Sequence, residues 1–83
     1  MQLDERIARL IAVGASVTAN CQPCISTNMK KALEAGADRG EIAQAIAIGR
    51  MVRKGAASHM DSYIAVISDT TASLPAEACD CGL

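Results

Sequence analysis

The sequence predicts a single all-α domain of about four helices, and three observations support this fold class. Apolar residues recur at helical spacing along most of the chain, and the strict apolar–polar alternation of a half-buried strand does not appear. Helix start and stop signals separate the periodic segments. The 83 residues include one tyrosine and no phenylalanine or tryptophan, although about half of them are apolar. The core must therefore be built from aliphatic side chains.

The first predicted helix covers about residues 3–19. Glu5, Arg6 and Arg9 are expected to point away from its buried face, and Glu5 and Arg9 have the i,i+4 spacing of a weak ion pair. A short turn at residues 19–20 then leads to the next helix. The expected buried face carries residues at helical spacing: Leu3, Ile7, Leu10, Ile11, Gly14 and Thr18.

The second predicted helix covers about residues 22–35. Pro23 suits its first turn, where a missing N–H leaves no helix hydrogen bond unmade. Gly36 is expected to end the helix in the left-handed conformation that often follows a last turn. The expected buried stripe is Ile25, Met29, Ala32, Leu33 and Gly36.

Two further helices are predicted after that glycine. Asp38 and Glu41 have the spacing of a capping box for a third helix over residues 39–54. Its middle is apolar nearly all round, so we expect it to be buried on several sides, some of them by another subunit. Gly55 is expected to mark a break or kink before a fourth helix that ends near residue 69. The stripe of this fourth helix is Ala56, Ala57, Met60, Tyr63, Ile64 and Ile67.

The remainder of the chain has turn residues and no period. We therefore divide the sequence into a helical domain over residues 1–72 and a C-terminal tail over residues 73–83, which carries Cys79 and Cys81. A core of this size is marginal by itself, which predicts a homo-oligomer.

Composition excludes several function classes. A formal net charge of −1 gives no electrostatic footprint for nucleic acid. No segment approaches the 18 consecutive apolar residues of a membrane span, and the first residues lack the pattern of a signal peptide. We expect no nucleic-acid or membrane partner and a cytoplasmic location, where paired cysteines are more often catalytic or metal-binding than structural.

Cys21 and Cys24 form a Cys-x-x-Cys motif at the start of the second helix, and with Asn28 they fall between its buried and solvent faces. One helical turn brings the two sulfurs together. Exposed N–H groups and the positive end of the helix dipole stabilise a thiolate there. The pattern favours a disulfide that forms and breaks, with Cys21 attacking and Cys24 resolving. The alternative is a pair of small buried side chains or a structural disulfide without redox activity.

Cys79 and Cys81 allow three interpretations. They form a second dithiol that exchanges with the first, or they complete a four-thiolate zinc or iron–sulfur site with Cys21 and Cys24, or they have no role. A tethered tail dithiol has a high effective concentration, which favours the first interpretation.

His59 is the only histidine of the chain and lies beside the stripe of the fourth predicted helix. A surface or interface position is its commoner explanation. It is also the only side chain here whose unperturbed pKa suits a proton relay.

The order of these motifs resembles the AhpD-like, or carboxymuconolactone decarboxylase, family of small all-helical proteins. The resemblance covers roughly residues 7–67. It is carried by the Cys-x-x-Cys segment at 15–24, by Lys-Ala-Leu-Glu-Ala-Gly-Ala at 31–37 and by Glu-Ile-Ala-Gln-Ala-Ile at 41–46. It implies a trimer or hexamer of helical hairpins, and a redox-active dithiol as in the alkylhydroperoxidase branch, which serves antioxidant defence.

The chain departs from that family at two positions. Members with peroxidase activity carry a glutamate twelve residues before the first cysteine and a histidine four residues after the second, and these form a proton relay. Arg9 and Asn28 occupy those positions here. Asn28 can donate a hydrogen bond to a thiolate, but neither side chain replaces a general base.

The sequence thus predicts a thiol–disulfide oxidoreductase that uses Cys21 and Cys24, with Asn28, His59, Cys79 and Cys81 as possible accessory residues. No cofactor is predicted, and the partner is a disulfide or a thiol. A thiolate metal-binding protein that uses both cysteine pairs is the alternative from another class. A non-catalytic structural oligomer is the third.

Overall fold

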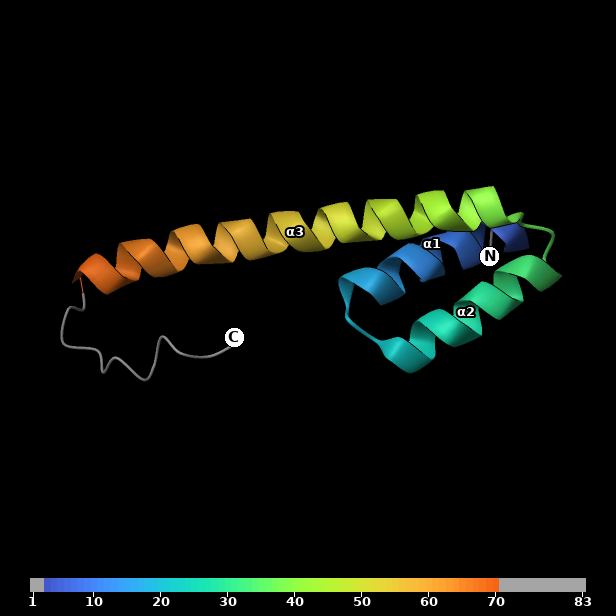
Figure 1. Cartoon of the computed structure of the whole chain (residues 1–83), viewed down its shortest axis with the longest axis horizontal. Helices are drawn as coiled ribbons and strands as arrows, with labels where there is room; N and C mark the ends of the chain where they lie inside the picture. The colour runs from blue at the N-terminus through green and yellow to red at the C-terminus, as the bar shows by residue number, and fades with distance from the viewer. Residues whose placement is uncertain (1–2, 71–83) are drawn as a thin grey trace.

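The computed structural model describes residues 3–70, which form three helices: α1 (Glu5–Thr18), α2 (Gln22–Glu34) and α3 (Arg39–Thr70). No strand occurs within this range, so the all-α class is confirmed. Figure 1 shows α1 and α2 as an antiparallel hairpin beside the first half of α3. The helix α1 packs against both other helices, whereas α2 and α3 hardly touch.

The core is small and lies where α1 meets the other two helices. Its buried members are Val13, Ala32, Ala37 and Ile42, with Leu10, Met29, Ala45 and Ile46 packed around them. The predicted buried face of α1 was wrong in part, because the residues that α1 buries are Val13, Ser16 and Val17. Ile7 and Ile11 are instead 39% and 56% exposed. They lie beside an open groove between α1 and α3 that no part of the described chain fills.

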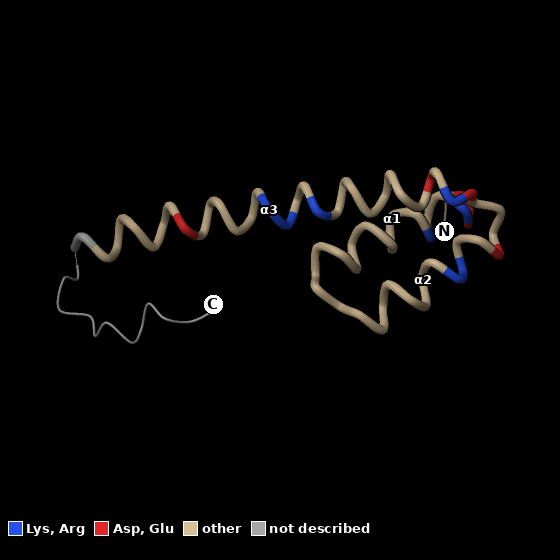
Figure 2. The backbone as a smooth tube through the Cα atoms, viewed as in Figure 1, with Lys and Arg blue, Asp and Glu red and all other residues tan. Residues whose placement is uncertain are grey.

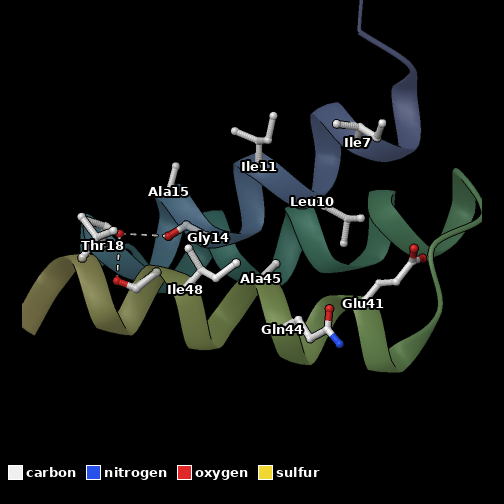
Figure 3. Close-up of a pocket in the computed structure, with 12 residues that line it drawn as sticks. Ile7, Leu10, Ile11, Gly14, Ala15, Thr18, Glu41, Gln44, Ala45 and Ile48 are labelled. Atoms are coloured by element: carbon white, nitrogen blue, oxygen red, sulfur yellow. Dashed lines mark hydrogen bonds between the residues drawn. The ribbon is translucent and has the colours of Figure 1, made fainter.

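That groove is apolar and has a volume of about 500 Å³. Figure 3 shows it with α1 on one side and α3 on the other, and Ile11 and Ala15 point away from α3. Ile48 and Val52 line it from α3 and are also about half exposed.

The two helices α1 and α3 cross most closely at two glycines. A Cβ atom on Gly49 would collide with the backbone carbonyl of Gly14 and would lie 2.9 Å from the Cβ of Val17. A Cβ on Gly14 would lie 3.0 Å from the carbonyl oxygen of Ala45. The Thr18 hydroxyl is 3.1 Å from the Gly14 carbonyl oxygen and 3.0 Å from that of Gly49, so it links the two backbones (Figure 3).

The start of α3 confirms the predicted capping box. The Glu41 N–H donates to the Asp38 carboxylate at 2.8 Å, and the Asp38 N–H donates to the Glu41 carboxylate at 3.1 Å. Arg6 of α1 pairs with the same Glu41, so the polar side of α1 also makes contacts between helices. The predicted left-handed Gly36 is confirmed as well, with a φ of +100°.

The expected break at Gly55 is wrong, because α3 continues through this residue to Thr70. The third and fourth predicted helices are therefore one helix, and the described residues hold three helices rather than about four. A lone glycine costs a helix roughly 1 kcal/mol relative to alanine but keeps its N–H and C=O. The neighbouring residues Arg53, Lys54, Ala56 and Ala57 are good helix formers, so the hydrogen-bond ladder is not interrupted.

The second half of α3 extends beyond the ends of α1 and α2 (Figure 1), and we call residues 54–70 the projecting segment. Its apolar residues Met60, Tyr63 and Ile64 are 57%, 62% and 43% exposed. Among the described helices, none combines the length and the apolar character needed to cross a lipid bilayer.

Candidate redox site

The cysteine pair lies at the corner between α1 and α2. Asn20 follows the last turn of α1 with a φ of +57°, which is the left-handed conformation that asparagine tolerates. The Asn20 N–H then donates to the Val17 carbonyl at 3.0 Å, and the Cys21 N–H donates to the Ser16 carbonyl at 3.0 Å. This pair of bonds is a Schellman motif. It ends α1 and makes Cys21 the N-cap residue of α2.

Cys21 and Cys24 form a disulfide within the first turn of α2, and their Cα atoms are 5.2 Å apart. Pro23 lies at the start of this helix, as the sequence predicted. The Cys21 side chain makes no capping hydrogen bond, so the first N–H groups of α2 lack the side-chain oxygen that usually satisfies them. A thiolate at Cys21 would be stabilised by these N–H groups and by the helix dipole.

The two cysteines, which the sequence places alike between the buried and solvent faces of the helix, differ in exposure. Cys24 is exposed, whereas Cys21 is partly buried. The reason is that Cys21 lies in the wall of a pocket, while Cys24 is one turn along on the outer side of α2.

This pocket beside Cys21 has a volume of about 340 Å³. The corner supplies Asn20, Cys21 and Gln22 to its wall, and α3 supplies Arg50 and Arg53. Arg53 is fixed there, because its guanidinium donates to the Asn20 side-chain oxygen at 3.1 Å and to the Val17 carbonyl at 3.4 Å. It thereby places a positive charge at the carbonyl end of α1.

The sequence did not assign these arginines to the site. A helix predicted to end near residue 54 places Arg50, Arg53 and Lys54 at its C-terminal end, where positive charge suits the helix dipole. Their spacing of three residues puts Arg50 and Arg53 on one side of α3, but which neighbour that side meets is decided by tertiary packing.

Asn28 connects α2 to α1. Its amide nitrogen donates to the Cys24 carbonyl oxygen at 2.9 Å and to the Ser16 hydroxyl at 3.2 Å. Its amide oxygen accepts from Arg9 at 3.4 Å. Both amide hydrogens thus have partners in this form of the protein, and Asn28 holds the first turn of α2 against α1.

Arg9 and Asn28 are therefore neighbours in space, although 19 residues separate them in sequence. They are the two positions at which the resemblance places a glutamate and a histidine. Arg9 also pairs with Glu5 at 2.9 Å, so its guanidinium lies between an acidic group of α1 and the amide of α2. The two positions are thus close in space, but a guanidinium and an amide occupy them in place of a carboxylate and an imidazole.

The other predicted site residues are not brought to this corner within the described chain. His59 is an exposed residue of the projecting segment, and it does not line the pocket beside Cys21. Cys79 and Cys81 lie outside the described residues, so their exchange or metal-binding role stays a prediction. Within residues 3–70, no group of three or more histidine, cysteine or acidic residues is placed to hold a metal ion.

Comparison with known proteins supports the resemblance. Residues 2–66 match the sequence profile of the carboxymuconolactone decarboxylase family. A curated relative from Paracoccus denitrificans, described as "Uncharacterized protein 4 in cox locus", is 35% identical over 68 residues. This match covers 81% of the chain and 61% of the relative, so the chain spans about three fifths of the relative's length. No solved structure matches the chain.

Proposed function

The chain belongs to the carboxymuconolactone decarboxylase family, and from that premise we propose that it is a thiol–disulfide oxidoreductase whose working groups are Cys21 and Cys24. One observation carries the proposal. The two cysteines form a disulfide in the first turn of α2, and Cys21 lines an open pocket at the N-terminus of that helix. A dithiol with access to solvent beside a helix N-terminus has what reversible exchange requires.

The proposed reaction begins with the reduced protein. The Cys21 thiolate attacks one sulfur of a substrate disulfide, the substrate S–S bond breaks, and the released thiolate takes a proton from solvent. Cys24 loses its proton and attacks the sulfur of Cys21, which releases the second substrate thiolate. The substrate gains two electrons and two protons, and the protein is left with the Cys21–Cys24 disulfide. A dithiol reductant then restores the reduced protein by the reverse exchange.

The residues near the disulfide favour exchange over peroxide reduction. A guanidinium and an amide do not pass protons as a carboxylate and an imidazole do, so Arg9 and Asn28 supply no relay. Exchange between thiols and disulfides needs only a thiolate and a leaving thiol. We propose that this activity serves antioxidant defence in the cytoplasm, a compartment whose reducing poise suits a reversible dithiol.

The experiment is a single turnover of pre-reduced protein with bis(2-hydroxyethyl) disulfide, followed by mass spectrometry. We expect Cys24→Ser protein to accumulate a mixed disulfide between Cys21 and the substrate. Cys21→Ser protein should not form the mixed disulfide through which substrate reduction proceeds. The matched control is Ser26→Ala, an exposed residue in the same part of α2, which should react as the wild type does. Unchanged substrate reduction by both cysteine variants would overturn the proposal.

We also propose that the protein works as a homo-oligomer, a trimer or a hexamer. The support is the amount of apolar surface that the described residues leave exposed. The groove between α1 and α3 and the stripe on the projecting segment are both apolar. Contiguous apolar surfaces of this kind usually mark a contact with another chain. Sedimentation velocity of the wild-type protein at several concentrations measures the assembly directly, and a monomer at all of them would contradict it.

A further inference from the structure

The pocket beside Cys21 contains a positive charge with no partner. Within residues 3–70, the Arg50 guanidinium makes no hydrogen bond or ion pair, in contrast to Arg53, which is held by Asn20 and Val17. Among the described residues, no aspartate or glutamate lines this pocket. An arginine without a counter-ion in the wall of a concave site is free to bind an anion from solution.

The acidic residues of the described chain lie elsewhere. Five of them are near the opposite end of the hairpin, at the start of α1, the end of α2 and the start of α3: Asp4, Glu5, Glu34, Asp38 and Glu41. Figure 2 shows these red segments at that end, whereas blue segments in the middle of α3 lie opposite the closed corner of the hairpin. Asp61 and Asp69 are about 16 and 28 Å along α3 from Arg50 at 1.5 Å per residue, and both distances exceed the screening length at physiological salt.

The pocket has the size of a small-molecule site. A volume of about 340 Å³ is at the lower end of the range for ligand pockets, which is roughly 300 to 1,000 Å³. Its remaining wall consists of the apolar residues Val17, Ile25 and Ile46, together with Ser16. It thus offers an apolar surface for a short carbon chain, with Arg50 and Cys21 in the wall of the same cavity.

We propose that this pocket selects small disulfides that carry a carboxylate or a comparable anionic group a few atoms from the sulfur, and that Arg50 is the residue that binds this group. The inference rests on the proposed oxidoreductase function, because it names the substrate class of the same site. The anion on Arg50 holds the substrate disulfide against Cys21, and the exchange then runs as described above: two electrons pass from the Cys21–Cys24 dithiol to the substrate. Arg53 adds to the positive potential of the pocket, while its hydrogen bonds to Val17 and Asn20 hold the corner between α1 and α2 against α3.

The test uses three disulfides with the same two-carbon arms and different charge: 3,3′-dithiodipropionate, bis(2-hydroxyethyl) disulfide and cystamine. Each second-order rate with the pre-reduced full-length protein is divided by the rate with dithiothreitol under the same conditions. This division removes the intrinsic effect of substrate charge on a thiolate. We expect the normalised rate to be about tenfold higher for the dianion 3,3′-dithiodipropionate than for the neutral disulfide, and lowest for cystamine. These differences should disappear as the salt concentration is raised.

The decisive variant is Arg50→Gln, with Lys54→Gln as the matched control, because Lys54 is a nearby cation of α3 that does not line the pocket. Arg50→Gln should lower the dianion-to-neutral ratio about fivefold or more, whereas Lys54→Gln should leave it within about twofold. Using a ratio removes any effect of Arg50 on the reactivity of Cys21 itself, and Arg50→Lys should restore part of the preference.

The outcomes separate this inference from the proposed function. If the wild-type protein reduces none of the three disulfides, the oxidoreductase proposal fails. If it reduces the neutral disulfide with no preference for the dianion, the oxidoreductase stands and the anion site is overturned. An unchanged ratio in Arg50→Gln protein, or an equal fall in Lys54→Gln protein, also overturns the assignment to Arg50. The wild-type series depends on no variant, so misfolding of Arg50→Gln protein would not remove the test.

Discussion

The two halves of α3 present the same helical face to very different surroundings. In the packed half, Ala45 and Gly49 lie against α1, and the contact is so close that Gly49 has no room for a Cβ atom. About five turns after Ala45, at 3.6 residues per turn, Tyr63 lies on the same face and is 62% exposed. The pattern of apolar residues continues along α3, but among the described residues the helix that packs against it, α1, does not extend that far.

This difference teaches where the stability of the helix comes from. Most helical stability in proteins comes from packing of an apolar face against other elements rather than from helix propensity. The packed half has such a contact within one chain. The projecting segment has its apolar stripe and no described element against it, which is why a second copy is the partner that we propose.

The largest effect is expected for Gly49→Ala, which acts on the packed half. The added methyl group would meet the Gly14 carbonyl and the Val17 side chain, so the two helices must separate. We expect a loss of about 3 kcal/mol in the free energy of unfolding, at the upper end of overpacking costs. Urea unfolding followed by circular dichroism, at one fixed protein concentration, measures it. A change below about 0.5 kcal/mol would show that the helices do not cross at this point.

The next effect is expected for Ile64→Asp, which acts on the projecting segment. A carboxylate in the middle of an apolar contact must be desolvated without a partner, so self-association should weaken about 30-fold, or by about 2 kcal/mol. The control is Ser62→Asp, which adds the same charge to an exposed residue on the other side of the helix. Sedimentation velocity separates the two results. Equal assembly of both variants would place the contact between copies elsewhere.

The same comparison shows how much the sequence alone could predict. Local signals were sufficient for the all-α class, for the capping box at Asp38 and Glu41, and for the left-handed Gly36, because each depends on residues a few positions apart. Local signals also predict the position of the cysteine pair at the start of α2. Gly55 was misjudged because glycine ends a helix only where the neighbouring residues also favour an end.

The remaining parts of the site depend on packing between helices. Arg50 reaches the pocket of Cys21 because α3 packs against α1 beside the corner, and no periodicity indicates which neighbour that side of α3 meets. Arg9 and Asn28 are neighbours because α1 and α2 are antiparallel, and 19 residues separate them in the chain. The predicted buried face of α1 includes Ile7 and Ile11 because helical periodicity identifies an apolar side of a helix. It does not tell which of several apolar sides faces the core.

Thr18→Val returns to the packed half and removes only a hydroxyl group. The Thr18 hydroxyl has one hydrogen, which lies within reach of the Gly14 and Gly49 carbonyls. Valine keeps the branched shape, so the expected loss is that of one hydrogen bond, about 1 kcal/mol in the free energy of unfolding. Thr27→Val makes the same change at an exposed residue of α2 and should be nearly neutral. Equal effects of the two substitutions would mean that the hydroxyl does not link the helices.

Gly55→Ala is expected to have the smallest effect and the opposite sign to Gly49→Ala. A Cβ atom at Gly55 would meet no atom within 4 Å, and the residue lies inside a continuous helix. Alanine lowers the entropy of the unfolded chain and suits the helix, so the free energy of unfolding should rise by about 0.8 kcal/mol. The same unfolding experiment measures it. A loss of stability would mean that α3 bends at Gly55 in the assembled protein, as the sequence first suggested, and that the projecting segment meets its partner at an angle that only glycine permits.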